Sequence, residues 1–248
     1  MQQTWRFIPP IEASGLHQMA IDEWLLEQHR LGQELPCLRF YTWAPTAISL
    51  GYHQRNYPEY WHTLRWKHQA LDVVRRPTGG RAVLHQGDIT YGLIVSGYQG
   101  RRRDIYRHLC QFLIDGWQTL GIDLHLGTDN HQYQRSANCF GSSTAADLVM
   151  DNGYKVIGSA QLYRDGCILQ HGSMRLHPDP QLTQAVFGKA TSPTIELENI
   201  SPTDLVTTLM STAQSVFGIQ WRLKPLSLQE QATALEWAMA RQTTHSSE

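Results

Sequence analysis

The sequence predicts a mixed α+β fold in which β-sheets pack against helices. β-rich runs lie close together between residues 37 and 96 and again between residues 155 and 176, whereas residues 201–248 have a helical pattern. Strands grouped ahead of late helices favour an α+β or mixed α/β domain over alternating βαβ units. A chain of 248 residues with 41% hydrophobic and 17% charged residues can also bury a large core.

The first predicted helix spans Leu16–His29. Its apolar residues recur at helical spacing, and Ser14 precedes them as an N-cap for the free N–H groups of the first turn. Two β-rich runs follow, CLRFYTW (37–43) and TAISLGY (46–52). Pro45 lies between them and cannot donate a ladder hydrogen bond, so we expect a turn that joins two paired strands.

Three strands are expected in the middle of the chain, at Asp72–Arg76, Arg81–His85 and Ile89–Ser96. The segment Pro77–Gly80 separates the first two and contains two adjacent glycines. The sequence therefore indicates a strand, a glycine turn, a second strand, a further turn and a third strand.

A second helix is predicted over Ile105–Leu120, with Asp104 as its cap and Gly121 as its stop. Ile122–Leu126 is then expected to return as a strand. Residues 127–138 (GTDNHQYQRSAN) are mostly polar and show no apolar period. Loops of that length are often functional, so this segment is a candidate for carrying the chemistry.

The last elements have strong turn and cap signals. Strands at Lys155–Gln161 and Cys167–Leu176 are joined through Asp165-Gly166, a typical hairpin dipeptide. A helix is expected from Ser201 to about Phe217, and Ser227 with Glu230 forms a capping box for the final helix. We expect residues 1–248 to form a single domain, with residues 201–248 as its C-terminal helical portion.

Composition excludes several kinds of partner. The 21 basic and 22 acidic residues give a net charge of −1, so neither nucleic acid nor a membrane surface is an expected partner. Residues 1–10 lack the pattern of a secretion signal, which favours the cytoplasm. The four cysteines form no CxxC pair and the twelve histidines show no paired ligand spacing, so no metal and no cofactor are expected.

The segment RRPTGGRAVLH (75–85) is the densest candidate site. Adjacent glycines permit a positive φ and let another molecule approach the backbone, whose N–H groups can face a carbonyl or phosphate oxygen. Three arginines lie alongside. The residues alone fit either a cradle for an anion or acyl group or a tight turn between two strands with solvated arginines.

Cys139 and Lys155 form the second candidate pair. A thiolate favoured by a nearby cation is an effective nucleophile, and a desolvated lysine can exchange protons near neutral pH. Cys139 follows the long polar segment, whereas the other three cysteines lie within apolar runs and fit the role of core residues. His85 and His171 each lie beside a glycine and are either site residues or structural hydrogen-bonding groups.

Five segments together resemble, in order, the biotin/lipoate protein ligase and octanoyltransferase superfamily. They are MAIDE (19–23), LRFYTW with SLGYHQ (38–43 and 49–54), RRPTGGRAVLH (75–85), Thr90-Tyr91 and KVIGSAQ (155–161). The resemblance covers residues 5 to 180 and implies the fold of that superfamily, a single domain related to class II synthetases.

Departures from the ligase pattern point within the superfamily. Arg81 stands where ATP-dependent lipoate ligases typically carry a third glycine, and Cys139-Phe140 precedes the lysine motif. These features resemble the cysteine-dependent octanoyltransferases. Gly141–Asp147 stands where that pattern has a proline and a tyrosine soon after the Cys-Phe pair.

The resemblance implies an acyltransferase that moves an octanoyl group from acyl carrier protein, through a thioester on Cys139, to a lysine of a lipoyl-domain protein such as glycine cleavage H protein. Lys155 would favour the thiolate and shuttle protons. The substrate-binding residues expected on this basis are Arg75, Arg76, Thr78, Gly79, Gly80, Arg81, His85, Gly158, Ser159, Ala160, His171 and Gly172.

Two alternative functions remain open on the sequence. An ATP-dependent lipoate or biotin ligase would use Lys155 to contact an adenylate and would leave Cys139 incidental. A non-catalytic module would hold an acylated or lipoylated partner without turnover.

Overall fold

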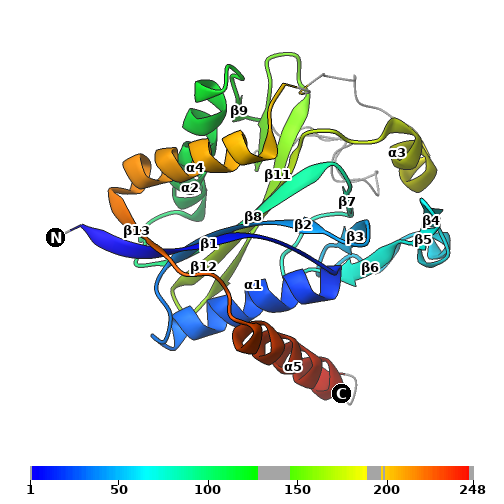
Figure 1. Cartoon of the computed structure of the whole chain (residues 1–248), viewed down its shortest axis with the longest axis horizontal. Coiled ribbons are helices and arrows are strands. Elements are labelled where there is room, and N and C mark those ends of the chain that lie inside the picture. The colour runs from blue at the N-terminus through cyan, green and yellow to red at the C-terminus, as the bar shows by residue number, and fades with distance from the viewer. Residues whose placement is uncertain (1, 128–145, 189–196, 198, 246–248) are drawn as a thin grey trace.

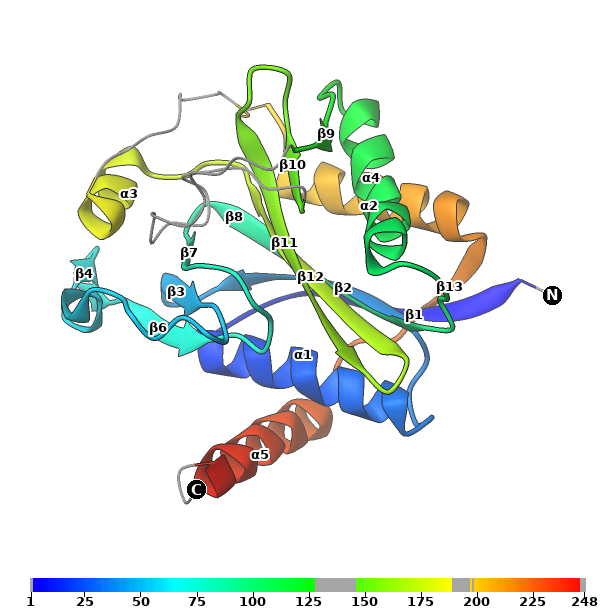
Figure 2. The ribbon, with the colours of Figure 1, turned by 180° about the vertical axis from the view of Figure 1, so that it is seen from behind.

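The computed structural model describes residues 2–127, 146–188, 197 and 199–245. An eight-stranded sheet crosses the molecule in the order β13-β1-β2-β8-β12-β11-β10-β9 (Figures 1 and 2). Its strands are β1 (Gln3–Ala13), β2 (Cys37–Trp43), β8 (Asp88–Ser96), β9 (His125–Leu126), β10 (Asp147–Val149), β11 (Lys155–Arg164), β12 (Cys167–Arg175) and β13 (Ile219–Leu223). β1 runs parallel to β2 and β13, and the other neighbours are antiparallel.

Two small sheets lie beside the large one. The three-stranded sheet has the order β6-β3-β7, from β3 (Ala47–Leu50), β6 (Asp72–Arg75) and β7 (Val83–His85). β4 (Arg65–Trp66) and β5 (Gln69–Ala70) form the other, next to the 3-10 helix η1 (Glu59–His62).

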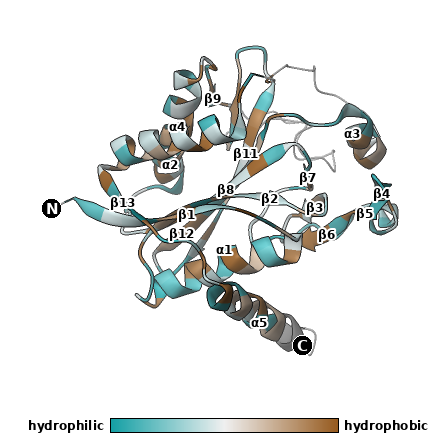
Figure 3. Cartoon of the chain, viewed as in Figure 1, coloured by the Kyte–Doolittle hydropathy of each residue, from teal (hydrophilic) through white to brown (hydrophobic). Residues whose placement is uncertain are grey.

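Helices cover both faces of the large sheet. α1 (Gly15–Arg30) packs on one face, with α5 (Leu228–His245) outside it, while α2 (Arg102–Thr119) and α4 (Pro202–Phe217) lie together on the other (Figures 1 and 2). α3 (Pro180–Phe187) packs on the small-sheet side. Each sheet face has its own apolar cluster. α1 carries brown and teal segments along its length (Figure 3), as expected for a helix with one buried face.

The fold class and most local signals are confirmed. Ser14 caps α1 by accepting from the His17 N–H, and Ser201 caps α4 by accepting from the Asp204 N–H. The β11–β12 hairpin turns at Asp165 and Gly166, which both have positive φ. At the start of α5 the side chains of Ser227 and Glu230 exchange hydrogen bonds with each other's backbone N–H.

The expected pairing of the strands on either side of Pro45 is wrong. β2 and β3 belong to different sheets, because both edges of β2 are already paired, with β1 and with β8. β3 instead pairs with β6 and β7. A short connection rich in turn residues fits a change of sheet as well as a hairpin.

Two details of the middle segment also differ from expectation. The N-cap of α2 is Arg101, without a side-chain cap, and Asp104 lies in the first turn, where it accepts from Arg101 Nε at 2.7 Å. The strand expected over Ile122–Leu126 is only the two-residue β9. Both differences concern element boundaries, which local patterns specify poorly.

β1 was not predicted from the sequence, because Pro9 and Pro10 lie within it and proline disfavours a regular strand. The register between β1 and β2 shifts between Ile8 and Ile11, so the prolines lie in an irregularity of the ladder. β13 pairs only with residues up to Phe7 and needs no N–H group from either proline.

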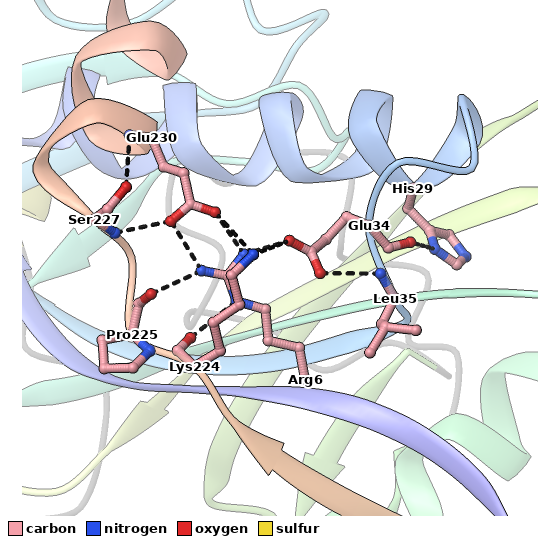
Figure 4. A network of polar contacts seen from close by, with 8 residues as sticks. All are labelled: Arg6, His29, Glu34, Leu35, Lys224, Pro225, Ser227 and Glu230. Carbon is pink, nitrogen blue, oxygen red and sulfur yellow. Dashed lines mark hydrogen bonds and ion pairs between the residues drawn. The ribbon is translucent and has the colours of Figure 1, made fainter.

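Arg6 joins β1 to the C-terminal elements (Figure 4). Its guanidinium is fully buried and donates to Glu34, to both carboxylate oxygens of Glu230, and to the carbonyls of Lys224 and Pro225, over distances from 2.5 to 3.2 Å. All five N–H groups of the side chain therefore have acceptors. This contact fixes the start of α5 against the sheet.

Within the described residues, the helices are all too short or too polar to cross a lipid bilayer.

Candidate active site

A cavity of about 290 Å³ opens where the three-stranded sheet, α1 and the centre of the eight-stranded sheet meet. Met19, Tyr41, Trp43 and Val83 give it an apolar wall. Of the residues expected to bind substrate, nine line it: Arg76, Gly79, Gly80, His85, Gly158, Ser159, Ala160, His171 and Gly172. The glycine loop with β7 and the β11–β12 hairpin, which are far apart in the sequence, thus line one pocket.

The glycine loop between β6 and β7 closes one side of the cavity. β3 lies between these two strands, so the loop crosses over a strand end and is not a tight hairpin turn. Arg76 is buried and its guanidinium donates to the carbonyls of Ser49, Gly79 and Arg81 at 2.7–2.8 Å. The Arg76 guanidinium therefore stabilises the loop by hydrogen bonding to the carbonyls of Gly79 and Arg81 within it.

Gly51 permits the close approach of this loop. A Cβ atom at Gly51 would lie 1.9 Å from the carbonyl oxygen of Gly80, which itself has a φ of +95°. The Tyr52 N–H also donates to the Thr78 carbonyl at 2.8 Å. The segments SLGY (49–52) and PTGG (77–80) therefore contact each other directly through their backbones.

His171 forms a buried hydroxyl–imidazole–carboxylate chain. Its Nε2 lies 2.6 Å from Thr78 Oγ1, and its Nδ1 lies 2.8 Å from Asp22 Oδ2. Asp22 also accepts from Arg39 at 2.7 Å and from the Tyr41 hydroxyl at 2.8 Å. Burial raises the pKa of Asp22, but Arg39, His171 and Tyr41 outweigh it, so the pKa lies below its ordinary value.

His85 forms a second such chain. Its Nδ1 lies 2.8 Å from Asp88 Oδ2 and its Nε2 lies 2.9 Å from Ser49 Oγ, while the ring stacks on Trp43 at 3.8 Å between centroids. Burial lowers the pKa of His85 and the neighbouring Asp88 only partly opposes this. This imidazole is therefore neutral at neutral pH.

Lys155 and Asp147 form a buried ion pair at 2.7 Å, with side chains 3% and 4% exposed. Asp147 lines the cavity. Lys155 is the first residue of β11, the strand that pairs with β10, on which Asp147 lies. Cys139, the other expected catalytic residue, lies outside the described residues. The structure therefore leaves its proximity to Lys155 as an expectation from the sequence.

Three expected binding residues are not among the described residues that line the cavity. Thr78 is buried beneath it, bonded to His171. Arg75 points to the neighbouring loop, where its Nη1 donates to the carbonyls of Gly51 and Gln54 at 2.7 and 2.8 Å. Arg81 accepts, through its carbonyl, from Arg76.

Sequence reasoning assigned no role to several cavity residues. Tyr41, Trp43 and Ser49 belong to the motifs that carry the family resemblance, and so does Asp22 behind His171. A buried carboxylate on a helix face that is otherwise apolar is the signal that marks Asp22. Asp147 had no such signal, because it follows a polar segment.

The described cysteines are poor nucleophiles. Cys37, Cys110 and Cys167 are all buried. Burial raises the pKa of Cys37 and of Cys110 to about 12 and also raises that of Cys167. Within the parts of the chain that the structure describes, His, Cys, Asp and Glu side chains form no cluster of three able to hold a metal ion.

The sequence of residues 14–222 matches the model of the lipoyl protein ligase A/B catalytic domain. Curated relatives include "Octanoyltransferase LipM" of Anoxybacillus flavithermus, 38% identical over 197 residues, and of Kyrpidia tusciae, 40% identical over 200 residues; each alignment covers 75% of this chain and 70% of the relative. The protein of the same name from Bacillus subtilis is 38% identical over 189 residues, which cover 72% of this chain and 67% of that protein.

Solved structures share the fold. A putative lipoate protein ligase from T. acidophilum with bound lipoic acid superposes with a TM-score of 0.78 at 19% identity, covering 97% of this chain and 96% of that one. A lipoate-protein ligase A bound with ATP gives a TM-score of 0.78 at 22% identity, covering 96% and 94%. At these identities the likeness concerns the fold alone.

Proposed function

The chain belongs to the lipoyl protein ligase A/B catalytic domain family, and from this membership and its octanoyltransferase relatives we infer that it is an acyltransferase that moves octanoyl groups in lipoate assembly. The observation that carries the inference is the identity of 36–40% to proteins of that activity over about three quarters of the chain. Its acyl donor and its lipoyl-domain acceptor follow in general terms from the same relatives.

The cavity suits an acyl chain. Its wall of Met19, Tyr41, Trp43 and Val83 is apolar, and the glycine loop brings backbone close to one end. An octanoyl chain buries about seven methylene or methyl groups at roughly 0.8 kcal/mol each, or about 5 kcal/mol. This is enough to hold the chain while a carbonyl at its end meets the polar residues of the pocket.

We propose Cys139 as the nucleophile. The thiols of Cys37, Cys110 and Cys167 are buried and have raised pKa values, so they do not supply a thiolate at neutral pH. Lys155, held by Asp147 at the cavity wall, supplies the positive charge that favours a thiolate. We propose that the expected binding residues shape the acyl site and its loop: Arg75, Arg76, Thr78, Gly79, Gly80, Arg81, His85, Gly158, Ser159, Ala160, His171 and Gly172.

The proposed reaction has two steps. The Cys139 thiolate attacks the thioester carbonyl of the donor, the C–S bond to the donor breaks, and the departing donor thiolate takes up the proton that Cys139 had released. The neutral acceptor lysine amine then attacks the new thioester, the C–S bond to Cys139 breaks, and an amide forms as one proton of the nitrogen passes to the departing Cys139 sulfur. Exchange of one thioester for another is nearly isoenergetic and amide formation is downhill, so positioning of the groups is the main requirement.

We propose octanoyl-acyl carrier protein as the donor and a lipoyl-domain protein such as glycine cleavage H protein as the acceptor. Intact mass spectrometry after incubation with octanoyl-acyl carrier protein tests the donor step. The wild type is expected to gain one octanoyl group, Cys139→Ser none, and the matched control Cys167→Ser one. Full transfer by Cys139→Ser would refute the covalent route.

Further measurements separate the alternatives. Pyrophosphate release that depends on ATP and on free octanoate or lipoate, without an acyl adduct from the carrier protein, would identify a ligase. A stable complex with acylated or lipoylated protein, without adduct or pyrophosphate, would identify a binding module. Addition of the acceptor protein to the isolated acyl-enzyme is expected to move the octanoyl mass onto one acceptor lysine.

A further inference from the structure

An exposed patch of positive charge lies at the start of α2. Residues 98–108 (YQGRRRDIYRH) contain four arginines and one acid, Asp104, in a chain whose net charge is −1. Of the described residues, only Asp104 forms an ion pair with the patch, to an arginine Nε at 2.7 Å. The arginine patch consists of four exposed residues: Arg101, Arg102, Arg103 and Arg107.

This arrangement is unfavourable for the helix itself. The positive end of the helix macrodipole lies at the N-terminus, where it repels the side chains of Arg102 and Arg103 in the first turn. Arg103 and Arg107 also lie one turn apart on the exposed side of α2, and like charges at that spacing destabilise a helix. The stability of α2 therefore does not account for the four arginines, whereas a negatively charged partner would.

The arginine patch adjoins the cavity through β11. Arg102 Cζ lies 4.6 Å from the centre of the Tyr163 ring. The Tyr163 hydroxyl donates to Gln161 Oε1 at 3.0 Å, and Gln161 lines the cavity. Gln161 in turn donates to the buried Gln170 at 2.7 Å, so its amide is held in place from both sides. The Tyr163 side chain is thus the one group between the patch and this part of the cavity lining.

The position of the arginine patch favours one of the two protein substrates of the proposed reaction. The described residues that line the cavity include none of its four arginines. An acceptor lysine reaches only about 6 Å from its backbone, so the acceptor protein must sit directly over the cavity. An acyl carrier protein holds its thioester at the end of a flexible prosthetic arm, which extends several times farther. The patch beside the cavity is therefore better placed for the donor.

We propose that the arginine patch of α2 docks the acyl-donating carrier protein through an acidic surface of that protein. The inference rests on the proposed octanoyl transfer and assigns a binding surface to its donor. Opposite charges on two partners raise their association rate by about 10- to 1,000-fold at low ionic strength, and salt weakens the effect. Arginine is also enriched at protein interfaces. Nucleic acid fits less well, because it is bound along an extended basic groove or stripe.

Acylation of the enzyme by two donors tests this docking surface. One is octanoyl-acyl carrier protein, and the other is octanoyl-pantetheine, a small neutral thioester that needs no protein contact. Arg103→Glu combined with Arg107→Glu reverses two exposed charges of the patch. At about 20 mM salt, intact mass spectrometry should show acylation by the carrier protein slowed at least about tenfold, and by octanoyl-pantetheine less than about twofold. At about 0.5 M salt the difference with the carrier protein should shrink to about twofold.

Arg65→Glu combined with Lys67→Glu is the matched control. It makes the same change in charge at exposed positions of the β4–β5 hairpin, on the opposite side of the molecule from α2 (Figures 1 and 2), and should leave both rates unchanged. Arg103→Glu places a negative charge in the first turn of α2, so the patch variant should melt no lower than the wild type. Its isolated octanoyl-enzyme should also discharge to the acceptor protein at the wild-type rate.

Unchanged acylation of the patch variant by the carrier protein would overturn the docking surface, and loss of single-stranded DNA binding in that variant would then assign the patch to nucleic acid. Equal slowing with both donors, or equal slowing in the control variant, would also overturn it. Slower discharge to the acceptor protein would assign the patch to the acceptor instead. Wild-type acylation by octanoyl-pantetheine alone would exclude the carrier protein as donor, and acylation by neither donor would refute the proposed function.

Discussion

Arg6→Met is expected to destabilise the fold by about 3 kcal/mol. The substitution keeps most of the apolar stem but removes five hydrogen bonds from a fully buried guanidinium. Removing one partner of a buried pair typically costs about 3–5 kcal/mol. The lower value applies here because Lys224 remains 3.2 Å from Glu34 and 3.3 Å from Glu230.

Urea unfolding measures this effect. With a slope of about 3 kcal/mol per M, expected for a chain of this size, the midpoint should fall by about 1 M. Arg222→Met is the matched control, because Arg222 is an exposed arginine on the adjacent strand, opposite Arg6 in the β1–β13 register. Its midpoint should barely change. Equal midpoints for the two variants would refute the role assigned to Arg6.

The pH dependence gives a second test. Burial raises the pKa of Glu230, but the hydrogen bonds and charges of Arg6, Ser227 and Lys224 outweigh it and hold the pKa at about 2, below the ordinary 4.5. This carboxylate therefore stabilises the fold fully above about pH 4.5 and loses that contribution as the pH falls from 4.5 to 2. The stability gap between wild type and Arg6→Met should narrow over the same window.

Three further predictions concern the cavity. Gly51→Ala places a Cβ 1.9 Å from the Gly80 carbonyl oxygen, so acyl-enzyme formation measured by mass should fall at least about tenfold; an unchanged rate would contradict the close contact. Lys155→Met removes one partner of the buried ion pair with Asp147 and should lower the free energy of unfolding by about 3 kcal/mol, measured with urea, whereas adding Asp147→Leu should recover most of that stability but no activity. The pKa of His85 is lowered by burial, so wild-type stability should decline as the pH falls below about 6.5, where the unfolded histidine gains a proton, and His85→Gln should show a smaller decline.

Local signals predicted the elements well. The Ser14 cap, the Ser227 and Glu230 capping box, and the Asp165-Gly166 turn depend on residues within four positions of one another, and the structure has all three. Such features are specified by short-range sterics and hydrogen bonding, which a sequence displays directly.

Long-range partners were not predictable in the same way. His171 meets Asp22 across 149 positions and Thr78 across 93, and nothing near any of them in the chain announces the others. The assignment of β3 to a separate sheet likewise depends on β1 and β8 having filled both edges of β2. The motifs predicted residues of which most line one cavity, and only the fold shows how they are bonded.

The bond between Arg6 and Glu230 spans 224 positions and so joins β1 to α5 across most of the sequence. During synthesis from the N-terminus, β1 leaves the ribosome long before β13 and α5 exist to shield it. Through most of translation the guanidinium of Arg6 must therefore stay hydrated. The edge of β1 that later pairs with β13 must stay unpaired over the same time. Completion of the sheet is therefore a late event, and nascent chains truncated before residue 219 should present that edge to chaperones or to other chains.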